Sequence, residues 1–263
     1  MPKDDDGIGY GEFTQLKLEH FEKIVHAHIR VTRAVMLKHK QFYPPGSRYR
    51  YIELTAGRGF SPARQKGTPL TFMSVAEAEG VDYRADLIEI SSGNCAELER
   101  NVELERNAKK WVHGEVEYHN GDYRTESVQL LGQPNGNEMG LIFADPSGDP
   151  PDFEILGQLA ALRTRMEILI YLSSTNIKRV YQFTGKRLVD GINAVGKGFW
   201  LIKNPVDWDK HKWTFLLGAS VPIFKDYKRI GFFRLDSARG QEIFEELNLT
   251  EQERFESKQP PLL

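Results

Sequence analysis

An acidic side chain and a glycine turn lie close together in Tyr51-Ile-Glu-Leu-Thr-Ala-Gly-Arg-Gly59. The apolar start predicts a strand that ends near Glu53, and Gly57 and Gly59 follow it. Glycine lets the backbone turn sharply and approach a ligand, and doubly wound sheets bind their ligands at the carboxyl edge. The third glycine of a dinucleotide fingerprint is missing, and Glu53 would repel a pyrophosphate. Glu53 could instead accept a hydrogen bond from a cationic ligand group, and an ordinary glycine turn is the alternative.

Two further carboxylates follow predicted strands. Glu89 ends the apolar run 85–90, and Asp122 follows the run 116–119 through Asn-Gly-Asp122-Tyr123. A carboxylate at the end of the second strand has two acceptor oxygens, so Glu89 could bind both ribose hydroxyls of an adenosine cofactor. Asp122 could accept a hydrogen bond from the adenine amino group. A plain Asx-type turn explains Asp122 equally well.

A fourth strand end is predicted in Leu141-Ile-Phe-Ala-Asp145-Pro146-Ser147-Gly148. It puts a carboxylate beside a rigid proline that has no N–H donor. The Asp145 carboxylate and the Pro146 carbonyl could hold an exocyclic amine so that its lone pair points at a methyl donor. A proline-rich loop with an unremarkable aspartate is the alternative for this motif alone. Four acidic strand ends in succession are much less expected by chance than any one of them.

The elements that must position these residues alternate between β-rich and helical runs, which is typical of βαβ units. We expect a Rossmann-like α/β fold with a mostly parallel seven- or eight-stranded sheet and helices on both faces. We divide the chain into an N-terminal tail and helical extension (1–45), an α/β domain (46–250) and a C-terminal tail (251–263). Predicted strands cover residues 49–54, 85–90, 116–119, 140–144, 166–173, 199–202, 213–219 and 231–235. One or two helices are predicted over 16–39, and one each over 68–79, 94–111, 127–131, 153–164, 175–194 and 238–247.

Composition indicates an ordinary globular protein. The 263 residues are 40% hydrophobic and 27% charged, and the start, Met-Pro-Lys-Asp-Asp-Asp, lacks the apolar stretch of a secretion signal. No run approaches the roughly 18 apolar residues of a membrane span, so we expect a cytoplasmic protein. The single cysteine, Cys95, excludes an internal disulfide and a cysteine-cluster metal site. Cys95 shares an apolar helical stripe with Leu98 and Val102, which predicts a buried structural thiol.

These motifs resemble the Rossmann-fold S-adenosylmethionine-dependent methyltransferases and, within them, the three-Cys-motif partner proteins. The resemblance depends on residues 51–59, Gly67-Thr-Pro-Leu70, Leu87-Ile-Glu89 and Phe143-Ala-Asp-Pro-Ser-Gly148. It spans residues 15 to 175, with a looser likeness over 213–247. It implies a methyl acceptor that faces Asp145, Pro146 and Ser147. It also implies an S-adenosylmethionine site formed by Glu53, Thr55, Ala56, Gly57, Gly59, Glu89, Asp122 and Tyr123.

The acidic motif departs from the Asp/Asn-Pro-Pro-aromatic motif that is usual in amino-group methyltransferases of nucleic acids. Asp145-Pro146-Ser147-Gly148 lacks the second proline and the aromatic residue, and Asp149-Pro150-Pro151-Asp152 lacks the aromatic residue. An aromatic side chain that stacks on a base must therefore come from elsewhere in the chain.

The formal net charge of −2 conceals a basic region. Residues 163–234 carry 14 Lys or Arg and 5 Asp or Glu, a balance of +9, which leaves −11 for the remainder. This imbalance favours an anionic partner for one face, although charges that separate in the sequence can mix in space. Interleaved aromatics could stack on bases but are more often core residues. We expect phosphate contacts from Lys178, Arg179, Lys186, Arg187, Lys210, Lys212, Lys228 and Arg229.

The sequence therefore predicts a methyltransferase that acts on an exocyclic amine in nucleic acid, with adenine N6 in DNA favoured over a target in RNA. Two alternatives remain open. One is methylation of a small molecule or a protein, and the other is a non-catalytic nucleic-acid-binding protein that retains the fold.

Overall fold

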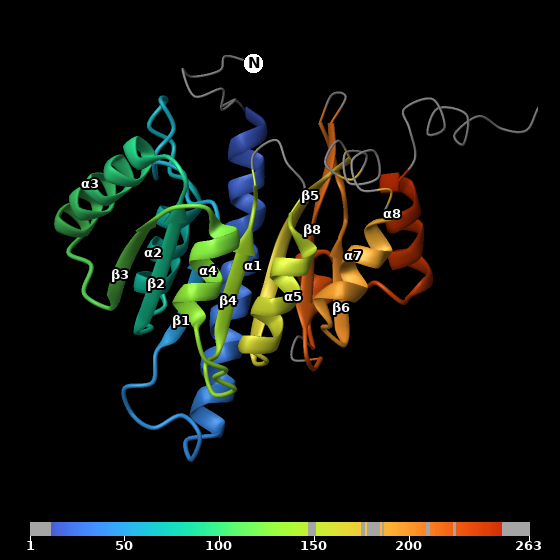
Figure 1. Cartoon of the computed structure of the whole chain (residues 1–263), viewed down its shortest axis with the longest axis horizontal. Helices are drawn as coiled ribbons and strands as arrows, with labels where there is room; N and C mark the ends of the chain where they lie inside the picture. Colours follow the sequence, from blue (N-terminus) through green and yellow to red (C-terminus); the bar gives the residue numbers. More distant parts are fainter. Residues whose placement is uncertain are drawn as a thin grey trace, which may run out of the picture.

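A computed structural model describes residues 12–146, 151–174, 177, 185, 187–208, 211–222 and 225–248. Its centre is one nine-stranded sheet with the strand order β3-β2-β1-β4-β5-β8-β6-β9, and β7 pairs with β8 beside this path. Helices cover both faces of the sheet (Figure 1). Within the described part of the chain, no helix is both long enough and apolar enough to cross a membrane.

The first half of the sheet is parallel. Its strands are β1 (Tyr49–Glu53), β2 (Tyr83–Glu89), β3 (Gly114–Asn120), β4 (Gly140–Ala144) and β5 (Met166–Ser173). Every residue of β1 and β4 is buried, as expected for parallel strands with helices on both faces. The connecting helices are α2 (Thr68–Ala78), α3 (Ser92–Lys109), α4 (Tyr123–Leu131) and α5 (Phe153–Leu162).

The second half of the sheet is antiparallel, so the expectation of a mostly parallel sheet is wrong and the sheet is mixed. Strand β8 (His211–Ala219) pairs antiparallel with β5, β6 (Phe199–Lys203) and β7 (Val206–Trp208), and β6 pairs antiparallel with β9 (Phe232–Arg234). The connection from β6 to β8 has no room for the crossover helix that parallel neighbours require. The other elements here are α7 (Leu188–Val195), the 3-10 helix η1 (Tyr227–Ile230) and α8 (Ala238–Asn248).

Each of the eight predicted strands coincides with an observed strand, and the ninth is the three-residue β7, which is too short to show a periodic pattern. Half of the predicted helix over 175–194 lies outside the described residues, and its last part, 188–194, lies in α7. The thiol of Cys95 is buried, as its helical stripe predicts, and burial raises its pKa.

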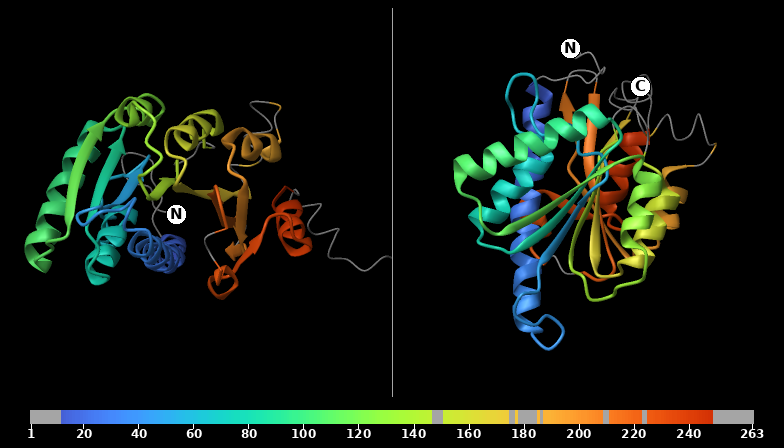
Figure 2. Two further views of the ribbon diagram at one scale, coloured as in Figure 1. Left: turned by 90° about the horizontal axis from the view of Figure 1, so that it is seen from below. Right: turned by 60° about the vertical axis from the view of Figure 1, so that its left-hand side comes forward.

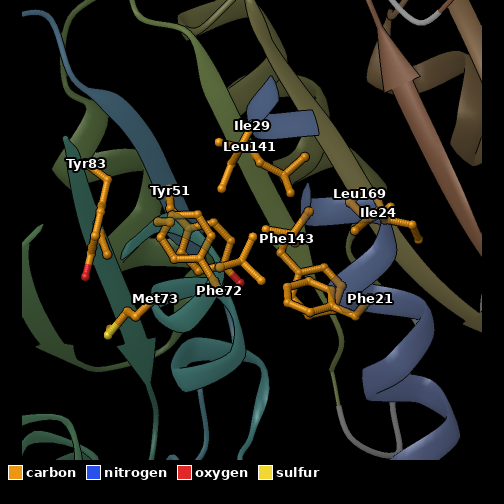
Figure 3. Close-up of a cluster of buried hydrophobic side chains, with 14 of the residues drawn as sticks. Phe21, Ile24, Ile29, Tyr51, Phe72, Met73, Tyr83, Leu141, Phe143 and Leu169 are labelled. Atoms are coloured by element: carbon orange, nitrogen blue, oxygen red, sulfur yellow. The ribbon is translucent and has the colours of Figure 1, made fainter. Parts of the chain in front are cut away.

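Residues 12–38 form a single helix, α1 (Glu12–Lys38), which covers the middle of the sheet. Its apolar residues recur at helical spacing, and Phe21, Ile24 and Ile29 are fully buried. The Phe21 ring centroid lies 4.7 Å from that of Phe143 in β4 (Figure 3). Helix α1 begins at the edge of the sheet where the parallel strands end, and runs back toward the opposite edge (Figure 1).

Two hydrophobic cores hold the helices to the sheet. One contains apolar residues of α1, α2 and α3, with Tyr51 and Phe72 stacked at 3.8 Å between ring centroids (Figure 3). The other contains apolar residues of α4, α5, α7 and α8. Figure 2 shows α1 and α2 on one face and α4, α5 and α7 on the opposite face. The carboxyl edge of the parallel half is therefore held from both sides.

Candidate functional site

Strand register brings the predicted carboxylates to one edge. Glu53 is level with Leu87 of β2, so Glu89 lies two residues further along. Glu89 is level with Asn120 of β3, so Asp122 in turn lies two residues beyond that level. Parallel strands share a direction, and these three side chains consequently follow the same edge of the sheet.

Glu89 fixes the glycine turn. Its Oε2 accepts a hydrogen bond from the Gly57 backbone N–H at 2.8 Å, and its Oε1 accepts one from the Ser91 N–H at 2.9 Å. Gly57 and Gly59 have φ values of +65° and +84°, which glycine adopts without strain. A Cβ on Gly59 would lie 3.0 Å from the Leu98 side chain of α3, so the turn also requires a small residue there. Each Glu89 oxygen keeps a second lone pair for a ligand.

Glu53 is buried and held in place by two hydroxyl groups. The Tyr51 hydroxyl donates to its Oε2 at 2.7 Å, and the Thr68 hydroxyl donates to its Oε1. Burial raises the pKa of Glu53 to about 8, and these two hydrogen bonds oppose that rise. Glu53 is therefore mainly protonated at neutral pH.

Thr55 and Ala56 connect Glu53 and Leu54 to the glycine turn. The Thr55 hydroxyl oxygen is buried and has no hydrogen-bond partner among the described residues. Ala56 is buried, and its N–H donates to the Ile88 carbonyl at 2.9 Å. An orphaned hydroxyl between Glu53 and the glycine turn fits a ligand that brings its own polar groups.

Asp122 caps helix α4, so the Asx-type turn is present. Its carboxylate accepts the Arg124 backbone N–H at 2.9 Å and pairs with the Arg124 guanidinium at 3.3 Å. The Asp122 side chain is still 40% exposed, which leaves it accessible to a ligand. The guanidinium of Arg124 also lies 4.9 Å from the ring centroid of Tyr123.

The sequence did not single out Ile90, which directly follows Glu89. Its side chain is 70% exposed at the carboxyl edge, an unusual place for a large apolar residue at the end of a buried strand. The only available signal was its position one residue after the strand's last carboxylate. Ile90 offers an apolar surface beside the polar groups of Glu89.

Asp145 forms an ion pair with Lys17, which the sequence analysis did not identify as a site residue. The Lys17 ammonium donates to Asp145 Oδ2 at 2.7 Å, and the two side chains are 18% and 15% exposed. The same nitrogen lies 5.0 Å from the ring centroid of Tyr171 in β5. Burial, with a smaller contribution from Asp145, raises the pKa of the Tyr171 phenol, so it stays neutral. A cation is thus held between a carboxylate and an aromatic face.

The neighbours of this ion pair extend the site. Asp145 raises the pKa of Glu53 and Lys17 lowers it, and both effects are smaller than that of burial. Pro146 is buried beside Asp145, and Ser147 lies outside the described residues. Lys17 reaches the site because α1 begins at this edge (Figure 1).

One predicted phosphate contact is wrong. The Lys212 side chain is only 3% exposed and pairs with Glu246 of α8 and, at 3.5 Å, with Asp207 of β7. A buried cation held by two carboxylates is not available to a phosphate. Arg187, Lys228 and Arg229 are exposed, and Lys178, Arg179, Lys186 and Lys210 lie outside the described residues.

Other cations of the basic region also serve the fold. The Arg163 guanidinium pairs with Glu138, and the Lys197 ammonium donates to the Thr164 carbonyl at 3.1 Å. The Lys203 ammonium donates to the Ile230 carbonyl. Burial lowers the pKa of Lys197, and burial with repulsion from Lys23 lowers that of Lys203 to about 8. The imbalance of +9 therefore overstates the charge that this region presents to a partner.

Asp86, Glu117 and His119 form the one group of possible metal ligands in the described part of the chain. Arg50 pairs with Asp86 at 2.5 Å, and Arg84 pairs with Glu117 at 2.9 Å. Two guanidinium groups already balance these carboxylates, so the cluster fits an internal ion-pair network better than a metal site.

No protein-family model and no curated protein matches the chain, so the resemblance to the three-Cys-motif partner proteins is not confirmed. Among solved structures the chain is similar to protein LPL1258 from Legionella pneumophila, with 17% identity, a TM-score of 0.48, and coverage of 78% of this chain and 87% of that chain. It is also similar to the METTL16 MTase domain, with 12% identity, a TM-score of 0.48, and coverage of 84% and 73%. A third similarity is to the N-terminal domain of EvdMO1 solved in the presence of SAH and D-fucose, with 11% identity, a TM-score of 0.44, and coverage of 72% and 83%. Likenesses at this level assign no function, which depends on the residues of the site.

Proposed function

We propose that this protein is an S-adenosylmethionine-dependent methyltransferase that methylates an exocyclic amine of a nucleic-acid base, with adenine N6 in DNA as the favoured acceptor. The observation that carries the proposal is the setting of Asp145. This carboxylate directly follows the central parallel strand β4, accepts a hydrogen bond from a nitrogen donor at 2.7 Å beside an aromatic ring, and lies at the same edge as the glycine turn that follows β1. An amine acceptor needs this combination of a hydrogen-bond acceptor and a ring face.

The glycine-turn edge supports the cofactor assignment. Glu89 keeps lone pairs for ribose hydroxyls, and Asp122 remains accessible to the adenine amino group. Ile90 offers an apolar surface to the adenine ring. Thr55, Ala56 and Tyr123 complete this set beside Gly57 and Gly59. When bound, S-adenosylmethionine supplies an electrophilic methyl group on a sulfonium.

Glu53 meets the cationic amino-acid end of the cofactor in this proposal. Because its pKa is raised to about 8, it is mainly neutral in the free protein at pH 7. A cationic ammonium nearby favours the carboxylate form, so binding is expected to release a proton from Glu53. Proton release can be measured by calorimetry in buffers of different ionisation enthalpy.

Asp145 orients the acceptor. The target amine donates one N–H to Asp145 and the other to the Pro146 carbonyl, which leaves its lone pair for the methyl carbon. During methyl transfer the Asp145 carboxylate would stabilise the positive charge that develops on the acceptor nitrogen. The methylated amine would then lose a proton to solvent. Ser147 is expected beside this acceptor.

The phosphate contacts of the proposal come from exposed cations. Arg187, Lys228 and Arg229 support it, and Lys178, Arg179, Lys186 and Lys210 remain candidates from the sequence. The preference for DNA over RNA depends on no particular contact and is tested directly.

The test is incubation with tritiated S-adenosylmethionine and separate pools of duplex DNA, single-stranded DNA and RNA, followed by nucleoside analysis. Label in N6-methyladenine of a DNA pool is the expected result. Label only in RNA would keep the reaction and change the substrate. Cofactor binding without transfer to any nucleic acid would favour a small-molecule or protein acceptor, or a non-catalytic binding protein.

A further inference from the structure

The acceptor subsite already contains an amine. The Lys17 ammonium is bound to Asp145 Oδ2 at 2.7 Å and lies over the Tyr171 ring, 5.0 Å from its centroid. A nitrogen donor between a carboxylate and an aromatic face reproduces what the proposed target amine requires. Lys17 and the acceptor therefore compete for the same oxygen.

The ring below Lys17 is in the right place to contact a base. Ala144 is level with Ile170 in the parallel register, so Asp145, directly after β4, and Tyr171 of β5 follow this pair on neighbouring chain segments. Tyr171 can supply the aromatic face that the sequence after Pro146 lacks. Only 8% of Tyr171 is exposed, and the Lys17 side chain covers part of it.

Helix α1 fixes the backbone of Lys17 at the site, while the lysine side chain has its own rotatable bonds. Lys17 lies one turn before Phe21, whose fully buried ring packs on Phe143 and fixes this face of α1 toward the sheet (Figure 3). The four-carbon stem of a lysine can change rotamer without moving the backbone. Displacement of the ammonium from Asp145 therefore needs no movement of α1.

We propose that Lys17 is a specificity-determining residue, which occupies the amine subsite until the acceptor displaces it. This inference depends on the proposed function, because it assigns the Asp145 subsite to the acceptor amine. An acceptor must offer an N–H to Asp145 and a ring to Tyr171 to replace both contacts of the ammonium. A ligand that makes only one of these contacts is excluded by the resident lysine.

The test compares Lys17→Met with the wild type in methyl transfer to the preferred nucleic-acid pool. Methionine keeps the length and apolar stem of lysine and removes the ammonium. If the subsite is available for only part of the time in the wild type, freeing it should lower the acceptor KM about 5- to 10-fold. The affinity for S-adenosylhomocysteine should change less than about twofold, since the proposed cofactor contacts remain. Lys38→Met, at the exposed far end of α1, is the matched control and should behave as the wild type.

Lysine acylation followed by peptide mapping gives a second readout. Lys17 should be acylated faster when acceptor is added, because displacement exposes its amine, whereas Lys38 should not respond. Two results would overturn this inference: an acceptor KM of Lys17→Met that is unchanged or higher, or a Lys17 amine that stays protected from acylation when the acceptor binds. If the wild type still transfers the methyl group, either result leaves the proposed function intact. Absence of transfer by the wild type and by Lys17→Met, both folded and able to bind S-adenosylhomocysteine, would instead overturn the proposed function and this inference with it.

Discussion

The parallel and antiparallel halves of the sheet use their charged residues differently. In the parallel half, β1, β2 and β4 run the same way, so Glu53, Glu89 and Asp145 reach one edge. In the antiparallel half, neighbouring strands point in opposite directions, and cations such as Lys203 and Lys212 are buried in contacts within the fold. The position of a strand end therefore predicts where a carboxylate lies more reliably than a count of charges predicts an exposed basic surface.

The comparison also separates two kinds of burial. Within the described part of the chain, Glu53 is buried at the candidate site against two hydroxyl groups and pairs with no cation, whereas Lys212 is buried against two carboxylates. Burial against hydroxyl groups brings the pKa of Glu53 close to neutral pH, so a small change in its surroundings can change its charge, as is typical of groups at functional sites. Burial of Lys212 against carboxylates neutralises a charge and supports the packing of α8 on the sheet.

The largest expected effect is on the pH dependence of stability through Glu53. Its folded-state pKa of about 8 exceeds the ordinary value of 4.5, so its contribution to stability is present below pH 4.5 and is lost as the pH rises through 8. Glu53→Gln mimics the protonated form and should remove this loss. The free energy of unfolding of the variant relative to the wild type should rise by up to about 4 kcal/mol between pH 5 and pH 9, at about 1.4 kcal/mol per pKa unit.

Urea unfolding at several pH values measures this difference. Glu103→Gln, an exposed change on α3, is the control and should show a constant difference. Parallel pH profiles for Glu53→Gln and the wild type would show that Glu53 titrates normally and that its burial is relieved in solution.

The next largest effect is expected at Asp145. Asp145→Ala should lower turnover by about 100-fold or more, because orientation of the amine and stabilisation of the developing charge are both lost. Cofactor affinity should stay within a few-fold of the wild type. Single-turnover transfer and calorimetry separate these quantities. A folded Asp145→Ala protein that methylates at the wild-type rate would exclude the catalytic role.

Asp145→Asn separates geometry from charge. The amide oxygen can still accept a hydrogen bond, but the negative charge is gone. A mild defect would indicate that geometry dominates, and a severe one that charge does. If Asp145 only stabilises the loop that follows β4, Asp145→Ala and Asp145→Asn should both lower stability and activity together.

The parallel half could be predicted closely from the sequence because its signals are local. An apolar run followed by an acidic residue marks both the strand and its end, as at Glu53 and Glu89. The mixed sheet could not be predicted in this way, since strand direction depends on connections and not on periodicity. Lys17 was missed because its contact with Asp145 joins residues 128 positions apart, and no local pattern reports such a pairing. Lys212 was misassigned because its carboxylate partner Glu246 lies in a different element.

A smaller effect is expected at Glu89. Glu89→Ala should weaken S-adenosylmethionine binding by about 1 to 3 kcal/mol, since it removes charge-assisted hydrogen bonds to the ribose and releases the Gly57 N–H. Glu89→Gln keeps one acceptor oxygen and should fall between alanine and the wild type. Titration calorimetry measures both. No heat for the wild type with either S-adenosylmethionine or S-adenosylhomocysteine, with the fold intact, would count against the cofactor assignment.

The smallest expected effect sharpens the contrast between exposed and buried cations. Lys228→Gln with Arg229→Gln should lower DNA affinity only a few-fold at moderate salt, and should flatten the slope of log affinity against log salt by about 2, because each lost phosphate contact releases about 0.9 fewer counterions. Lys212→Gln should leave that slope unchanged and lower the free energy of unfolding by about 2 kcal/mol, since it leaves Glu246 without its buried partner. Fluorescence anisotropy at roughly 50 to 200 mM salt measures the salt slope, and urea unfolding measures the stability. If Lys212→Gln flattened the salt slope as much as the Lys228→Gln, Arg229→Gln double variant does, the ion pair between Lys212 and Glu246 would have to open in solution. The charge count over residues 163–234 would then be a correct measure of the DNA-binding surface.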